Sequence, residues 1–237
     1  MCERYCGTVS PVASSSLPRA RVSRSALRAG AAAALAAGGT VADLRADAWG
    51  HGVLETARIV AEAGFSSIRV DAEDVEALVA HGIPVSASAE PDVDPAILYG
   101  LPGESTPPAM TLVGTVMSTK RLQPGDAVSY GYLFRTPVET QVALVTGGYS
   151  QGVVRALGGK ARAEIGGALH PIVGRVAMDV CVVDLGDAVA DEGTEVTYFG
   201  GTGAAQQELT TWMQATGLTA AELVCAAGEQ SLREYIE

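Results

Sequence analysis

The pattern of secondary structure changes once along the chain, and this change limits the folds open to it. Between residues 40 and 86, apolar strand patterns alternate with helix patterns. Strands are predicted at 41–45, 67–70 and 83–86, and helices at 53–63 and 72–80. Such alternation is typical of parallel strands joined by crossover helices. A preceding helix is predicted at 26–37, with Ser23 or Ser25 as its N-cap.

The alternation stops at a segment rich in proline, residues 88–108, which marks a connection or boundary. Beyond it the patterns are those of strands and turns, at 111–116, 142–146, 171–173, 176–185 and 195–199, with helices at 206–216 and 220–227. We therefore expect an α+β protein in which a parallel part (18–101) precedes a mainly-β domain with a helical tail (102–237). Residues 1–17 show no periodicity and are predicted to be disordered.

The composition excludes some functions. A formal net charge of −11 argues against nucleic acid or an anionic membrane surface as partner, because like charges repel. Three arginines before the alanine-rich run 29–37 weakly resemble a secretory signal. That run is short, weakly hydrophobic and a good helix former, so we favour a helix in a cytoplasmic protein without a membrane span.

The cysteines and histidines show no metal-binding pattern. Cys2, Cys6, Cys181 and Cys225 have no further Cys or His pair at zinc-site spacing, and the three histidines lie far apart in sequence. We expect reduced, structural thiols and no bound metal.

Three stretches resemble the alanine racemase family, whose members interconvert L- and D-alanine with pyridoxal phosphate. Residues 44–52 read L-R-A-D-A-W-G-H-G, similar to the family's V-K-A-D-A-Y-G-H-G. Residues 128–131 read V-S-Y-G, between P-G-D and a strand that ends in G-G-Y. Residues 171–179 read P-I-V-G-R-V-A-M-D, close to P-I-V-G-R-V-C-M-D. Their order and the secondary structure between them make the resemblance specific.

The resemblance implies an eight-stranded (β/α) barrel followed by a β domain. Such barrels need roughly 250 residues, whereas the barrel-like part here spans residues 40–101. We therefore expect a truncated barrel fragment of about three parallel strands with helices, followed by an alanine-racemase-type C-terminal domain.

The resemblance also implies that the site has lost its chemistry. The lysine that forms the Schiff base corresponds to Arg45, whose guanidinium stays protonated and is a poor nucleophile. Trp49 replaces a phosphate-binding tyrosine, and Glu229 falls at the position of a second one. The lysines of the chain, Lys120 and Lys160, are predicted to lie in exposed loops.

Other family positions are retained. Tyr130 matches the second catalytic base, and Met178 and Asp179 match residues that line the partner subunit's substrate pocket. These residues are interpreted either as structural survivors or as parts of a working pocket, and we favour the first interpretation. For Arg45 we favour an ion-pair cluster with Asp43 and Asp47 on one side of a strand over binding of a carboxylate ligand.

Three hypotheses follow for the function. The leading one is an inactive alanine-racemase-like protein that binds no cofactor and acts as a homodimeric binding or structural module. The alternative is an active alanine racemase, or another pyridoxal-phosphate isomerase, with a rearranged site. The third is a regulatory module that pairs with a genuine racemase through its β domain.

Overall fold

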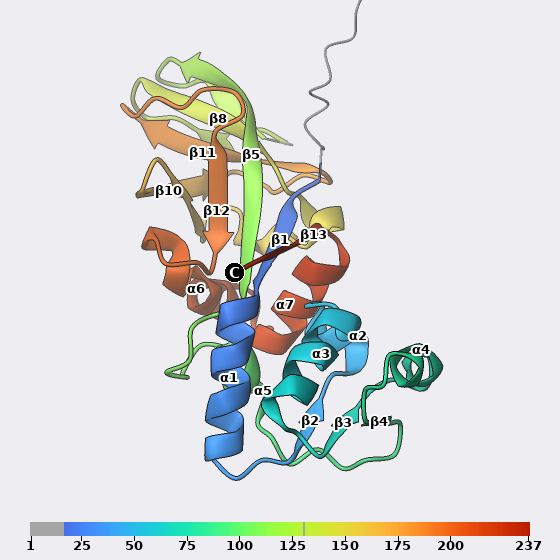
Figure 1. The fold of residues 1–237 in the computed structure, drawn as a ribbon. Helices are drawn as coiled ribbons and strands as arrows, with labels where there is room; N and C mark the ends of the chain where they lie inside the picture. Colours follow the sequence, from blue (N-terminus) through green and yellow to red (C-terminus); the bar gives the residue numbers. More distant parts are fainter. Residues whose placement is uncertain (1–16, 130) are drawn as a thin grey trace, which may run out of the picture.

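The fold is described by a computed structural model for residues 17–129 and 131–237 (Figure 1). The predicted disorder of residues 1–17 and the predicted state of Cys2 and Cys6 lie outside this description, apart from Leu17. The described residues form a small parallel α/β unit and a larger antiparallel barrel. The predicted α+β class, a barrel fragment followed by a β domain, is confirmed.

Three parallel strands form the smaller sheet, in the order β2–β3–β4. The strands are β2 Val41–Asp43, β3 Ser67–Arg69 and β4 Val85–Ser86, and the helices of this part are α1 Arg24–Ala36, α3 Val53–Ala63, the 3-10 turn η1 Ala72–Asp74, α4 Val75–Ala80 and α5 Pro95–Tyr99. Ser23 caps α1 by accepting a hydrogen bond from the Ala26 backbone N–H at 3.1 Å. In this part of the described chain, β4 leads to α5 without another parallel strand, so the sheet stays open.

Six antiparallel strands close into a barrel. They are β5 Met110–Leu122, β8 Thr140–Thr146, β9 Arg162–Ile165, β10 Ala168–Val173, β11 Val180–Gly186 and β12 Glu195–Phe199. The order β12–β9–β10–β11–β8–β5 becomes a ring because β12 also pairs with β5. Closure removes the free edges of these strands. A short ribbon of β6 Ala127–Val128 and β7 Phe134–Arg135 extends from the barrel.

Two strands from opposite ends of the described chain join the barrel to the α/β unit. Strand β1 Arg19–Ser23 pairs antiparallel with β5 and parallel with β13 Leu232–Ile236. Before β13 the chain forms α6 Glu208–Thr216 and α7 Ala220–Glu229, whose Thr219 and Glu222 make a capping box. The remaining 3-10 turns are η2 Tyr149–Gln151, η3 Arg155–Leu157 and η4 Ala204–Gln207. Strands β6, β7, β9 and β13 and helix α5 were not predicted from the sequence, and β11 begins at Val180 rather than at residue 176.

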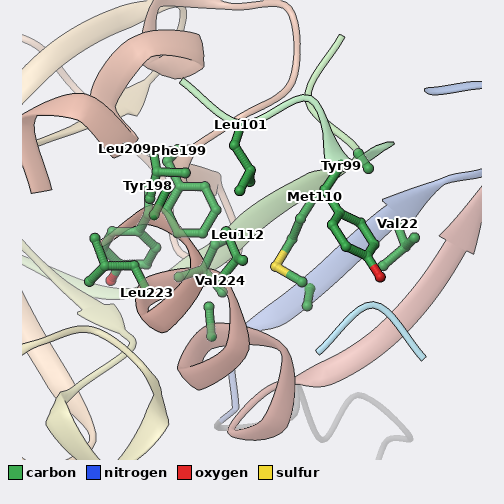
Figure 2. Close-up of a cluster of buried hydrophobic side chains, with 14 of the residues drawn as sticks. Val22, Tyr99, Leu101, Met110, Leu112, Tyr198, Phe199, Leu209, Leu223 and Val224 are labelled. Carbon is green, nitrogen blue, oxygen red and sulfur yellow. The ribbon is translucent and has the colours of Figure 1, made fainter. Parts of the chain in front are cut away.

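The main core lies where the barrel meets α6 and α7. Trp212 of α6 is fully buried and meets the rings of Tyr198 and Phe199 edge to face. Figure 2 shows Leu112 and Met110 of β5 beside Leu223 and Val224 of α7 in the same cluster. Apolar side chains from the barrel, the helices and α5 thus share one core. No helix in the described part of the chain is long and apolar enough to cross a membrane.

Candidate functional site

A left-handed turn follows β2 and carries the L-R-A-D-A-W motif. From Ala46 to Trp49, four residues have φ between 50° and 54°, a region that non-glycine residues seldom enter. The Ala46 N–H donates to Asp71 at 2.7 Å, and Asp47 accepts from the Val53 N–H at 2.7 Å. These contacts hold a backbone that is costly on its own. The predicted strand 41–45 is therefore wrong at its end, because β2 stops at Asp43 and Arg45 lies on the turn.

Arg45 pairs with Asp43. Its Nε lies 2.9 Å from one carboxylate oxygen of Asp43 and its Nη2 lies 2.5 Å from the other. Burial raises the pKa of Asp43, but the hydrogen bonds and charge of Arg45 outweigh it and leave the pKa below its ordinary value. The same hydrogen bonds raise the pKa of Arg45. The predicted ion pair of Arg45 is confirmed for Asp43 and wrong for Asp47.

Asp47 instead ties the turn to the last strand. Its carboxylate accepts from Nη2 of Arg233 at 2.5 Å, while Nε of Arg233 donates to the Gly50 carbonyl at 3.2 Å. Helix α7 supports the same turn through Gly228, where an added Cβ would lie 2.1 Å from the Gly50 carbonyl oxygen. Glu229, the next residue, is exposed at the end of α7.

Aromatic rings cover the inner side of the turn. Trp49 is half-buried and stacks on Tyr99 with ring centroids 5.6 Å apart, and the buried His51 stacks on Tyr99 at 4.3 Å. Nδ1 of His51 lies 3.0 Å from the carbonyl oxygens of both Ala48 and Trp49. The turn therefore packs against helix α5 through these three rings.

The lysines of the chain lie on the barrel. Lys120 is exposed on β5, opposite Val142 of β8, so its predicted place in a loop is wrong, although its predicted exposure is confirmed. Lys160 is exposed in the turn before β9, where its Nζ lies 3.3 Å from the Ala215 carbonyl oxygen. Each belongs to an element other than the turn that carries Arg45.

Met178 and Asp179 lie in the loop before β11. Met178 is 55% exposed, and Ser150 donates to the Met178 carbonyl at 2.8 Å. The backbone at Gly148 approaches this loop so closely that a Cβ there would lie 2.2 Å from the Met178 carbonyl oxygen. Among the described residues, no hydrogen bond or ion pair joins Met178 or Asp179 to the Arg45 turn. Tyr130 lies outside the described residues.

The remaining polar clusters offer no metal site. In residues 17–129 and 131–237, no group of three or more His, Cys, Asp and Glu side chains is arranged to hold a metal ion. Cys181 is buried, with its Sγ 3.2 Å from the Tyr198 hydroxyl, and burial raises the pKa of its thiol to about 12. Cys225 is free as well.

The fold and this turn define a class of protein: a parallel α/β unit, in which the left-handed turn of residues 46–49 follows strand β2, joined to a closed β barrel. Residues 109–235 match the family described as alanine racemase, C-terminal domain. The chain belongs to this family.

Curated relatives agree with this assignment. The chain is 38% identical over 143 residues to the alanine racemase of Thermobifida fusca, covering 58% of this chain and 38% of that protein. It is 38% identical over 156 residues to that of Treponema pallidum, covering 61% and 41%. The chain thus spans about two fifths of the length of these curated relatives.

Solved structures show the same fold. The alanine racemase of Streptomyces lavendulae superposes with a TM-score of 0.81 at 21% identity, over a span covering 93% of this chain and 97% of that one. The Bartonella henselae enzyme, solved with covalently bound pyridoxal phosphate, superposes with a TM-score of 0.73 at 16% identity, covering 93% and 99%.

The residues of this turn do not fit that cofactor. A covalent bond to pyridoxal phosphate needs a neutral amine. Arg45 offers a protonated guanidinium that the Asp43 carboxylate already holds through two hydrogen bonds.

Proposed function

We propose that this chain is a non-catalytic alanine-racemase-like protein that acts as a dimeric binding or structural module in the cytoplasm. The observation that carries the proposal is the bidentate pair of Arg45 with the buried Asp43 at the position of the family's lysine. An arginine so held is a structural group of the turn. The pair leaves no nucleophile at the position where the family's chemistry begins.

Four further residues support the absence of a cofactor. Lys120 and Lys160, the chain's amines on side chains, are exposed on the barrel. Trp49 packs its ring on Tyr99 and has no hydroxyl for a phosphate. Glu229, aligned with a phosphate-binding tyrosine, brings a carboxylate that repels a phosphate dianion.

A dimer is supported by the exposed apolar side chains at one end of the barrel. Met178 is 55% exposed, and Tyr149, whose N–H donates to the Ala177 carbonyl at 2.9 Å, is 42% exposed. Tyr132 and Leu133 are 68% and 62% exposed. They follow Gly131, where an added Cβ would lie 3.9 Å from Nη1 of Arg175, in the loop that also holds Met178. A second copy of the chain is the proposed occupant of this surface. A cytoplasmic location agrees with the free thiols of Cys181 and Cys225.

The absence of cofactor is tested by spectroscopy. We expect protein purified in excess pyridoxal phosphate to stay colourless after gel filtration, and borohydride to leave no pyridoxyl-lysine in its peptide mass map.

Arg45→Lys restores an amine without the phosphate-binding tyrosines, so we expect no alanine racemisation above background. The racemase of Thermobifida fusca, treated in parallel, is the positive control. A yellow parent protein that bleaches on reduction, or turnover of L-alanine by the parent chain, would establish the enzyme alternative, whereas turnover by Arg45→Lys would show that something else replaces the missing barrel units.

The dimer is tested by light scattering at micromolar concentration. We expect a particle of twice the chain's 24.2 kDa mass. Met178→Asp places a charge in the proposed interface and is expected to weaken dimerisation at least tenfold. The matched control is Val189→Asp, at a residue 79% exposed outside the proposed interface. A monomeric parent chain refutes the homodimer, and a complex formed only with an added racemase supports the regulatory hypothesis instead.

A further inference from the structure

A cavity of about 360 Å³ lies beside the loop of residues 100–108, where this loop faces the end of β12 and helix α6. Its volume falls in the range of small-molecule sites, roughly 300–1,000 Å³. The loop residues Gly103, Glu104 and Ser105 are exposed at its rim. His51 lines the cavity and belongs to the motif of residues 44–52, but Arg45, Trp49, Met178, Asp179 and Glu229, which align with the family's catalytic, substrate-binding and cofactor-binding positions, do not.

The accessible lining of the cavity is more polar than apolar and includes Glu104, Ser105, Thr106, Gln206 and Gln207, whereas its buried part is apolar. Met110 of β5, Phe199 of β12 and Leu209 of α6 line it and are buried. Figure 2 shows these side chains near Leu101 and Tyr99, which line the same space. A ligand that reaches Met110, Phe199 and Leu209 would therefore bury ring or hydrocarbon surface against them, and its other side would meet polar groups of the lining.

One residue that lines the cavity has a buried polar atom without a partner. His51 lines the cavity and is fully buried, and among the described residues no hydrogen-bond partner meets its Nε2. The other ring nitrogen, Nδ1, lies 3.0 Å from two backbone carbonyl oxygens. Because carbonyl oxygens only accept, Nδ1 carries the proton and Nε2 is left as an acceptor. An unfilled buried acceptor is costly, which favours a ligand that supplies a donor.

The charge state of the ring agrees with this role. Burial, together with the nearby charge of Arg233, lowers the pKa of His51 to about 4, although its hydrogen bonds to backbone carbonyls and the charge of Asp47 act in the opposite direction. The imidazole is therefore neutral near pH 7, and a neutral ligand suits it better than a charged one.

The cavity is formed before any ligand arrives. Thr106 donates to the Ile97 carbonyl at 2.8 Å, and the Ala109 N–H donates to the Tyr99 carbonyl at 3.0 Å. At Gly100, which has φ of 62°, an added Cβ would lie 2.0 Å from the Pro107 carbonyl oxygen, so the two ends of the loop touch. A fixed wall lowers the entropy cost of binding.

We propose that this cavity binds a neutral molecule of one or two rings whose O–H or N–H group donates a hydrogen bond to Nε2 of His51. The rings would pack between Met110, Phe199 and Leu209. This site does not depend on whether the chain binds pyridoxal phosphate, so the two proposals stand or fall separately.

Indole and 1-methylindole are the test probes, because methylation removes the N–H donor. We expect indole to bind saturably and to shift the Nε2 resonance of His51 in protein with ¹⁵N-labelled histidine. The resonance of exposed His81 serves as an internal reference and is expected not to move. We expect 1-methylindole to bind about tenfold more weakly and to leave the Nε2 resonance in place.

Two variants separate this site from surface binding. Leu209→Trp fills the cavity from α6 and is expected to abolish binding of indole, whereas Gln214→Trp, on the exposed part of the same helix, is expected to keep it. Absence of saturable binding, equal affinity for both probes, or unchanged binding to folded Leu209→Trp overturns the proposal.

Discussion

Gly228→Val is expected to lower the free energy of unfolding by about 3 kcal/mol, at the upper end of the range for overpacked cores. The reason is the contact between α7 and the motif turn. An added Cβ at Gly228 would lie 2.1 Å from the oxygen, 2.6 Å from the carbonyl carbon and 2.7 Å from the Cα of Gly50. All three atoms are backbone, and the turn that carries them is held by Arg233 and Asp71. Neither side can move away without breaking these contacts.

Denaturant unfolding followed by circular dichroism measures this loss. Ala221→Val, in the first turn of the same helix, is the matched control: it adds a β-branched side chain and is expected to cost well under 1 kcal/mol. A Gly228→Val protein as stable as this control would show that α7 and the turn are not in rigid contact. Indole binding is expected to weaken too, because His51 follows the displaced Gly50.

Much of the fold could be predicted from local patterns. Helix α3 was predicted with its bounds of 53 and 63, and Ser23 was one of two predicted caps for α1. These elements follow from the spacing of apolar residues and from the N-cap preference, which act over a few positions. The β domain was indicated by the family resemblance together with the strand patterns after residue 110.

The turn at residues 46–49 could not be predicted in this way. Its residues are Ala, Asp, Ala and Trp. Asp enters the left-handed region more often than most residues, but none of the four is a glycine, and nothing local predicts four positive φ values in a row. The conformation depends on Asp71, which is distant in sequence and caps the Ala46 N–H. The partner of Asp47 was predicted wrongly for the same reason: Arg233 lies 186 residues away and reaches the turn only because β13 pairs with β1.

The cavity had no signal in the sequence at all. His51 was visible as part of the motif, but its isolation from other histidines gave only the absence of a metal pattern. The unpaired acceptor Nε2 can be identified only from the structure, in which Nδ1 lies against two backbone carbonyls and the loop 100–108 lies beside the ring. Strand β13 escaped prediction because L-R-E-Y-I alternates weakly and its residues are only half-buried or exposed.

Acid is expected to destabilise the chain through His51 by about 3 kcal/mol between pH 7 and pH 4. The pKa of the buried ring is lowered to about 4 from an ordinary value of 6.5. Between these two values the unfolded chain binds a proton at His51 that the folded chain does not. Protons therefore favour unfolding, so stability falls as the pH drops below 6.5 and this contribution levels off below about 4.

Unfolding by urea across this pH range tests the effect against two variants. His51→Asn keeps a side-chain N–H near the carbonyls of Ala48 and Trp49 but does not titrate, so its stability is expected to depend less steeply on pH by the same amount. His81→Gln, at an exposed histidine, is expected to follow the parent. Carboxylates that gain protons in acid, Asp43 among them, act equally in all three proteins and cancel in the comparison.

An NMR titration of the parent gives an independent reading, since a His51 midpoint near 6.5 would contradict burial of the neutral ring. Protonation would also fill the Nε2 acceptor with its own hydrogen, so indole binding is expected to disappear with the same midpoint near 4.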